Sequence, residues 1–231
     1  MGMKEKLGFH PNSHVLKPIP QKKTNSEIAH LKNKSKGSRE YRIIYFGNLF
    51  DYGMILGSAL KELEKCSSIR LEVRGSNPPW EQHFTEQMIE SKRLFPFEER
   101  AILDQWIATA DACLATQLFE PVQRQRMETN FISKILDYAQ YGKPIVIWGP
   151  EYGSAVQWAR KGNRALCVTD PDPSALRKAL ELLATLPDEQ QRLATAARIA
   201  AHTEFNPDVI QKQFMGALHE LICTGDHSYN A

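Results

Sequence analysis

Residues 130–150 read NFISKILDYAQYGKPIVIWGP and contain the strongest local pattern of the chain. Apolar residues recur there at three- and four-residue steps, which predicts a helix over residues 133–141. Gly142 follows, and because glycine lacks a Cβ it suits the left-handed backbone that commonly ends a helix. Residues 144–148 are then a short apolar run, as is typical of a buried strand. The stretch therefore predicts one helix–strand unit of an α/β fold.

The same alternation continues on both sides of this unit. Further short runs are typical of strands, and they lie at residues 41–47, 69–75, 93–95, 111–116 and 165–168. Segments with helical spacing separate them, and three more helices near the C-terminus each have a proline in the first turn, at Pro173, Pro187 and Pro207. This order predicts an α/β fold with a Rossmann-like parallel sheet of about six strands and helices on both faces.

Charge divides the 231-residue chain into an arm and a body. Residues 1–40 carry nine Lys or Arg and three acids, a net charge of +6, so the remaining residues sum to −4 within the total of +2. A basic run of this kind is usually a solvated segment, and a mildly acidic body is not typical of a nucleic-acid-binding domain. We expect a basic arm at 1–40, one folded domain at 41–223 and a tail at 224–231.

Cysteine spacing and hydropathy restrict the cellular setting. The four cysteines, at 66, 113, 167 and 223, form no CxxC pair, so we expect neither a disulfide framework nor a metal site. The sequence has no apolar stretch of about 18 residues and no signal-peptide core. These features predict a cytoplasmic protein without a cofactor, whose membrane contact is at most peripheral, at the inner face.

A ligand is expected at the carboxyl ends of the strands, where open parallel α/β sheets bind their ligands. The longest irregular connection there, residues 117–130, leads directly to Ser133. Ser133 and Lys134 at a helix N-terminus would suit a phosphate, and a carboxylate at Asp137, on the same face as Ser133, would suit a sugar diol. The same residues also fit a plain capped helix with a solvated Lys and Asp, and the pattern alone leaves both interpretations open.

A second loop, residues 148–155 (WGPEYGSA), also joins a strand to a helix. Gly153 and Ser154 would let a phosphate approach the backbone closely. The loop has neither the GxGxxG pattern of dinucleotide-binding folds nor the GxxxxGK[ST] pattern of a P-loop, so NAD binding and generic NTP hydrolysis are disfavoured.

The stretch FISKILDYAQYGKPIVIWGP is similar to the fPSKl-x-EY-x-x-x-GkPvv signature of nucleotide-sugar glycosyltransferases of the two-domain GT-B type, in particular the family-4 (group 1) enzymes. The order of YRIIYFGN, IRLEVRG, ADACLAT, the signature and CVTDPDPSALRKALELL also resembles their C-terminal, donor-binding domain. The resemblance covers residues 41–223. It implies a single GT-B half, with residues 1–40 as the linker remnant of an N-terminal acceptor domain.

The resemblance also implies a nucleotide diphosphate sugar as substrate and roles for individual residues. Lys134 and Asp137 would be the catalytic pair, with Lys134 near the diphosphate and Asp137 on the ribose. The turn at Gly47 and Asn48 would approach the phosphates, and residues 93–97 would contact the base. The implied donor-binding set is Gly47, Asn48, Arg74, Gly75, Phe95, Pro96, Thr129, Asn130, Ser133, Lys134 and Asp137.

The chain departs from the family pattern around the diphosphate. Family-4 enzymes often carry an Arg and a Lys just after the first strand, and the matching positions here are Asn48 and Gly53. In their E-x7-E pattern Asp137 matches the second acid, whereas the first position is Thr129. These departures remove charge that would stabilise a leaving diphosphate.

Three functions remain open at this point. The first is transfer of a glycosyl group from a nucleotide diphosphate sugar to a hydroxyl acceptor in polysaccharide or glycoconjugate synthesis, with the acceptor domain on another chain or missing from this one. The second is a catalytically silent nucleotide-sugar-binding or assembly module that keeps the fold. The third is a different phosphosugar enzyme of this fold, such as a nucleotide-sugar epimerase.

Overall fold

The computed structural model describes Pro18, Pro20 and residues 40–225, so the arm predicted at 1–40 lies almost wholly outside the described residues. Strands and helices alternate from residue 41 onward. In chain order they are β1 (Tyr41–Phe46), α3 (Leu49–Leu63), β2 (Ile69–Arg74), α4 (Gln82–Glu90), β3 (Leu94–Phe95), α5 (Arg100–Ala108), β4 (Ala112–Thr116), the 3-10 turn η1 (Pro121–Gln123), α6 (Arg124–Thr129), α7 (Lys134–Gln140), β5 (Ile145–Trp148), α8 (Ser154–Gly162), β6 (Leu166–Val168), α9 (Pro173–Ala184), α10 (Pro187–His202) and α11 (Pro207–Gly225).

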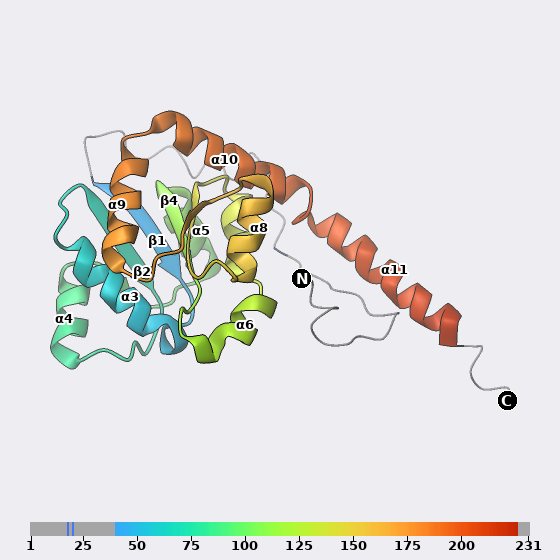
Figure 1. Cartoon of the computed structure of the whole chain (residues 1–231), viewed down its shortest axis with the longest axis horizontal. Coiled ribbons are helices and arrows are strands. Elements are labelled where there is room, and N and C mark those ends of the chain that lie inside the picture. Colours follow the sequence, from blue (N-terminus) through green and yellow to red (C-terminus); the bar gives the residue numbers. More distant parts are fainter. Residues whose placement is uncertain (1–17, 19, 21–39, 226–231) are drawn as a thin grey trace.

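The six strands form one parallel sheet in the order β3-β2-β1-β4-β5-β6 (Figure 1). This confirms the predicted Rossmann-like α/β class. The central pair is β1 and β4, which are joined side by side through Ile44 and Cys113. Strand order reverses at this pair, and in such sheets the reversal opens a crevice at the carboxyl ends of the strands.

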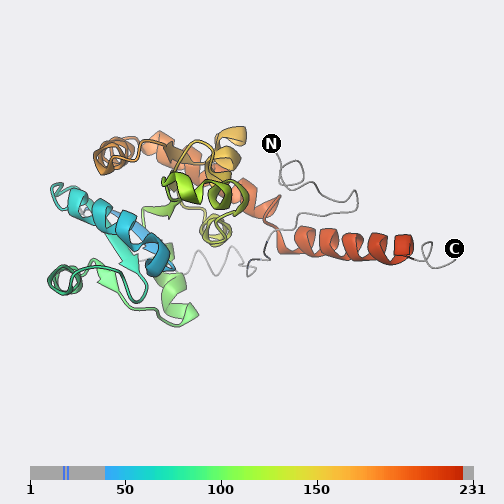
Figure 2. The same cartoon turned by 60° about the horizontal axis from the view of Figure 1, so that its bottom comes forward.

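Helices cover both faces of the sheet, as Figures 1 and 2 show. Along β1, Ile43 and Tyr45 point into a core with α3, α4 and α9, whereas Ile44 points into a second core with α5, α7, α8 and α10. All three side chains are fully buried. Each apolar side chain of this size stabilises the fold by about 1.5–3 kcal/mol when it is buried, so the alternation along the strands holds both layers of helices.

The connection at residues 117–130 differs from its prediction. It was expected to be irregular, but it contains η1 and α6. Met127 is buried on the inner side of α6, and Arg124 pairs with Glu128 one turn later, at 2.9 Å. The buried Met127 side chain and the i,i+4 ion pair both help to order this short helix on the folded body, and neither makes a periodic pattern in the sequence.

The last helix, α11, extends away from the rest of the described chain in both views (Figures 1 and 2). Ile210 in its first turns is buried, whereas Phe214, Met215 and Ile222 further along are exposed. No helix among the described residues is long and apolar enough to cross a membrane.

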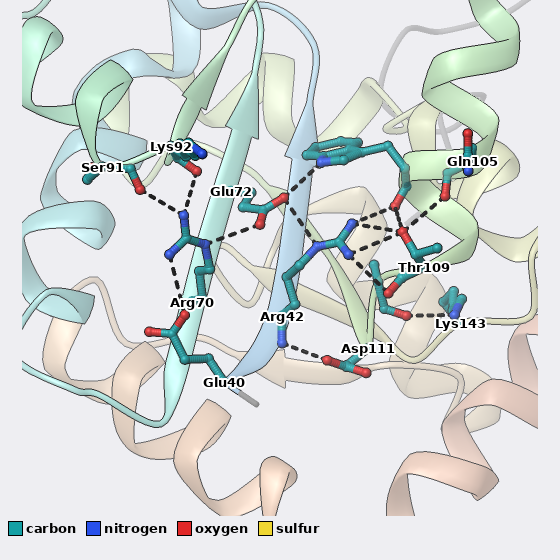
Figure 3. A network of polar contacts seen from close by, with 12 residues as sticks. Glu40, Arg42, Arg70, Glu72, Ser91, Lys92, Gln105, Thr109, Asp111 and Lys143 are labelled. Carbon is teal, nitrogen blue, oxygen red and sulfur yellow. Dashed lines mark hydrogen bonds and ion pairs between the residues drawn. The ribbon is translucent and has the colours of Figure 1, made fainter. Parts of the chain in front are cut away.

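Charged residues join α5 to the sheet. The Glu72 carboxylate on β2 accepts from the indole N–H of Trp106 at 2.8 Å and lies 3.2 Å from Nε of both Arg42 and Arg70 (Figure 3). Arg42 also donates to the backbone carbonyls of Trp106 and Thr109, at the carboxyl end of α5. We call Arg42, Arg70, Glu72, Trp106 and Thr109 the flank network. It joins α5 to β1 and β2 through polar contacts, in addition to the apolar contacts that α5 makes in the second core.

Candidate functional site

Three segments meet at the carboxyl ends of β1 and β2. The turn after β1 lies against the turn after β2, because a Cβ on Gly75 would be only 2.6 Å from the carbonyl oxygen of Gly47. The first residue of α7 reaches the same place, since Lys134 Nζ donates to the Tyr45 hydroxyl at 2.9 Å. These segments meet beside the strand-order reversal, where open α/β sheets bind ligands.

The ammonium group of Lys134 lies among aromatic rings. Its Nζ is 4.2 Å from the ring centre of Tyr45 and 5.5 Å from that of Tyr52, within the range of cation–π attraction. Gly47 makes room for it, because a Cβ there would lie 2.7 Å from Nζ. The φ angle of Gly47 is +139°, a backbone conformation that other residues rarely adopt. Glycine at 47 therefore leaves room for the cation beside the end of β1.

Lys134 has no counter-charge in the described part of the chain. Its ammonium donates to the Tyr45 hydroxyl and forms no ion pair with any residue of 40–225. Burial lowers the pKa of this ammonium to about 8. An ammonium has three donors, and only one is used here. A half-buried cation with unused donors is suited to an anionic ligand, whose charge would offset the cost of its partial desolvation.

The amino end of α3 lies next to this cation but is already capped. The Tyr45 hydroxyl donates to the Asn48 carbonyl at 3.3 Å, and Asn48 Oδ1 accepts the backbone N–H groups of Phe50 at 2.8 Å and Asp51 at 3.3 Å. Arg126 NH2, from α6, lies 2.7 Å from Asp51 Oδ2. Asn48 was expected to approach the phosphates, and its side-chain oxygen is engaged within the protein.

Gly53 stands where the family resemblance would place a lysine. A Cβ on Gly53 would lie 2.3 Å from Cδ of Pro79. Trp80 follows in the same loop, and its indole N–H donates to the Gly53 carbonyl at 2.7 Å. The loop after β2 thus packs onto α3 at this position, and the lack of a basic side chain is a feature of the packing as well as of the sequence.

Asp137 is paired between α5 and α7. Arg100 NH2 lies 3.0 Å from Asp137 Oδ1, and Arg100 Nε lies 2.7 Å from Asp104 Oδ1. The buried Asp104 also accepts the hydroxyl of Tyr141. Arg100 was not among the predicted site residues. Its i,i+4 spacing from Asp104 was visible on the predicted helix, but the link to Asp137, 37 residues later, exists only in the folded chain.

Three further predicted residues lie on the approach to α7. Ser133 is exposed at the N-cap and its side chain makes no capping hydrogen bond. The Thr129 hydroxyl donates back into its own helix, to the Gln125 carbonyl at 2.8 Å. Asn130 is exposed, and its carbonyl accepts from the Ser154 hydroxyl at 2.6 Å. Of these three, Ser133 stands next to Lys134 with its hydroxyl unused within the described residues.

Arg74, Phe95 and Pro96 form a separate cluster at the ends of β2 and β3. The buried Arg74 guanidinium lies 5.2 Å from the ring centre of Phe95 and 5.0 Å from that of Trp106, and it donates to the Pro96 carbonyl at 2.8 Å. Burial lowers its pKa. The structure therefore brings Arg74, Phe95 and Pro96 into contact with one another. Gly47 belongs to a different group of contacts, because it packs directly against Lys134.

Gln117, which was not among the predicted site residues, packs against the second loop. Gln117 Oε1 accepts the backbone N–H of Ala155 in the first turn of α8 at 3.2 Å, and its Nε2 donates to the Met127 carbonyl at 2.9 Å. A Cβ on Gly153 would lie 2.3 Å from Gln117 Oε1. The Gly-Ser loop considered as a phosphate site therefore holds a side chain of the protein. Within the described residues, no group of three His, Cys, Asp or Glu is placed to hold a metal ion.

No protein-family model matches the sequence, and no curated protein matches it. Solved structures match the fold. Anabaena HepE in complex with UDP-glucose is 20% identical with a TM-score of 0.62, over 87% of this chain and 54% of that one. Sucrose-phosphate synthase from Thermosynechococcus elongatus is 16% identical with a TM-score of 0.63, over 86% and 49%.

WaaG, a glycosyltransferase involved in lipopolysaccharide biosynthesis, is 19% identical with a TM-score of 0.59, over 91% of this chain and 58% of that one. The fold is that of GT-B glycosyltransferases. This chain spans about half the length of the solved structures that it matches.

Proposed function

We propose that residues 41–223 are the donor-binding domain of a GT-B glycosyltransferase and bind a nucleotide diphosphate sugar. Lys134 carries the proposal, because its side chain is half-buried and its ammonium has no ion-pair partner within the described residues, at the place where this fold binds ligands. A diphosphate would supply the missing charge, and charge-assisted hydrogen bonds are the strong ones. The HepE structures that contain UDP and UDP-glucose support this class of ligand.

The proposed reaction is glycosyl transfer to a hydroxyl acceptor. Lys134 would stabilise the charge that develops on the leaving diphosphate, and Asp137 would accept a hydrogen bond from the ribose. The acceptor would be held by a second domain, which the length of the matched structures supports. We place this reaction in polysaccharide or glycoconjugate synthesis in the cytoplasm.

A silent binding module is the second candidate. Asn48 uses its side-chain oxygen to cap α3, and Pro79 fills the space beside Gly53, so neither position offers a cation to a leaving diphosphate. One lysine can bind a diphosphate, whereas transfer asks for more charge on the leaving group than binding does. This candidate predicts donor binding without transfer.

Calorimetry of the purified chain with UDP, GDP, ADP and their sugars tests donor binding. We expect one of these nucleotides to bind, and Lys134→Met to abolish its binding heat. Lys143→Met is the matched control, because Lys143 Nζ donates to the Ala110 carbonyl at 2.6 Å, at the opposite end of the strands. Absence of binding by the parent chain, or equal loss in both variants, would overturn the proposal.

Assays of the bound sugar nucleotide separate the two candidates. Release of the nucleoside diphosphate upon addition of a hydroxyl acceptor and an acceptor domain indicates transfer. Tight binding with no release, under conditions in which an intact GT-B enzyme turns over, favours the silent module.

A further inference from the structure

One arginine joins two carboxylates at the edge of the proposed site. Arg100 opens α5 and contacts Asp104 on its own helix, at 2.7 Å, and Asp137 on α7, at 3.0 Å. Arg177 on α9 has the same arrangement elsewhere in the molecule, with Glu181 one turn later and Glu62 on α3, each at 2.9 Å. The two bridges differ in the carboxylate that the arginine contacts on the neighbouring helix, which is Asp137 for Arg100 and Glu62 for Arg177.

The inner end of the Arg100 bridge is fixed. Asp104 is buried and accepts both the Arg100 guanidinium and the Tyr141 hydroxyl, so its carboxylate has little freedom to turn. A guanidinium is planar, and its donors keep a rigid mutual geometry. With Nε held on Asp104, NH2 presents one donor in a set direction, and Asp137 Oδ1 lies on it.

The outer end of the bridge leaves one oxygen unused. Asp137 is bonded through Oδ1 only, its Oδ2 makes no hydrogen bond or ion pair within the described residues, and 24% of its side chain is exposed. The residue lies one turn after Lys134, on the side of α7 that faces Arg100. A carboxylate with one oxygen anchored and the other open is suited to accept a hydrogen bond from a ligand hydroxyl in a single geometry.

We propose that Arg100 is a positioning residue that sets selectivity for ribonucleotides, by holding Asp137 so that Oδ2 meets a ribose hydroxyl. This inference rests on the proposed function and adds to it the residue that selects the sugar of the nucleotide. Arg100 does not touch the ligand. It acts through Asp137, so its removal weakens recognition of the ribose hydroxyls and leaves recognition of the diphosphate by Lys134 unchanged.

The test compares each ribonucleoside diphosphate that binds the parent chain with its 2′,3′-dideoxy form, by calorimetry. We expect the parent to prefer the ribose form by about ten- to hundredfold, the range for a hydrogen bond to a charged group. Arg100→Gln should bring the ratio of the two dissociation constants close to one, with the dideoxy affinity unchanged. Arg100→Lys should give an intermediate ratio, because a lysine contacts the carboxylates as a point charge.

Two further variants serve as references for this ratio. Asp137→Ala sets the ratio expected when the hydroxyl contact is lost, and Arg177→Gln should keep the parent ratio although it removes an equivalent bridge. An unchanged ratio in both Arg100 variants, or an equal loss of both ligands, overturns the inference and leaves the proposed function intact. If Arg100→Gln does not fold, the Arg100→Lys ratio decides alone. Absence of nucleotide binding by the parent overturns both.

Discussion

The flank network and the Lys134 site both place charged groups against the same parallel sheet, yet they differ in how those charges are satisfied. Glu72 in the flank network is surrounded by three donors, from Arg42, Arg70 and Trp106. Lys134 meets one hydroxyl and two aromatic rings, without a carboxylate in the described chain. The paired charges join a helix to the sheet, whereas a cation without a carboxylate partner remains available to an anionic ligand.

Breaking the flank network should have the largest effect on folding. Glu72→Gln keeps the shape of the side chain but leaves Arg42 and Arg70 without their shared anion. We expect the free energy of unfolding to fall by about 3–5 kcal/mol, as for other buried pairs that lose one partner. Guanidinium unfolding at constant m-value measures it. Glu98→Gln is the control, since its contact with Arg74 is longer, 3.7 Å, and more exposed, and should cost less than about 1 kcal/mol.

Removing the Lys134 charge should change stability in the opposite direction. Its pKa is about 8 in the folded chain against an ordinary value of 10.5, so the unfolded chain binds the proton more tightly. The charge therefore opposes folding fully below pH 8, by up to about 3 kcal/mol, and the effect vanishes above pH 10.5. After loss of the Tyr45 hydrogen bond, Lys134→Met should gain about 2 kcal/mol at pH 7.

Urea unfolding of Lys134→Met and of the parent, at pH 7 and pH 10.5, tests whether the substitution raises the free energy of unfolding. The gain should shrink at the higher pH, because Lys134 is then neutral in the folded parent and only half protonated in the unfolded chain. Destabilisation at pH 7 would mean that Lys134 serves the fold, and the contrast with the flank network would be wrong.

The pH dependence of nucleotide affinity should be the next largest effect. Affinity should fall as pH rises through about 8, by up to about tenfold per pH unit, because the free site loses its proton before the ligand arrives. Burial raises the pKa of Tyr45 and of Tyr52, so these phenols stay neutral there. A terminal phosphate is fully ionised above about pH 7. Calorimetry from pH 7 to 10 should therefore show a single decline, and an affinity that does not change with pH would contradict a role for Lys134.

The sequence predicts the fold well because the fold rests on local patterns. Apolar runs such as residues 144–148 and glycines such as Gly142 mark strands and helix ends wherever they occur. α6 was not predicted because contacts with the folded body hold it, such as the buried Met127 side chain and the ion pair of Arg126 with Asp51. The strands could be predicted from neighbouring residues alone, whereas α6 could be predicted only from its contacts with the rest of the domain.

The candidate site was predictable only in part. Lys134 and Asp137 stood out because a short motif contains both. In the folded chain Lys134 has no ion-pair partner within the described residues, whereas Asp137 is held by Arg100. Both outcomes depend on segments that are far apart in sequence. The same is true of Gln117, whose amide fills the loop at Gly153. Pairing between distant side chains leaves no periodic signal, so a sequence can name the candidate charges but not which of them the fold will neutralise.

Arg126 provides the test with the smallest expected effect. It is a second cation near the Lys134 site, and unlike Lys134 it has an ion-pair partner, Asp51. Its pair with Asp51 is partly exposed, so removing both charges with Asp51→Asn and Arg126→Gln keeps the net charge and should cost at most about 1 kcal/mol of stability. If pairing decides which cation serves a ligand, this double variant should bind nucleotide within about threefold of the parent, a difference below 1 kcal/mol. A loss as large as that in Lys134→Met would show that both cations act on the ligand, and that the pairing of Arg126 with Asp51 does not prevent Arg126 from doing so.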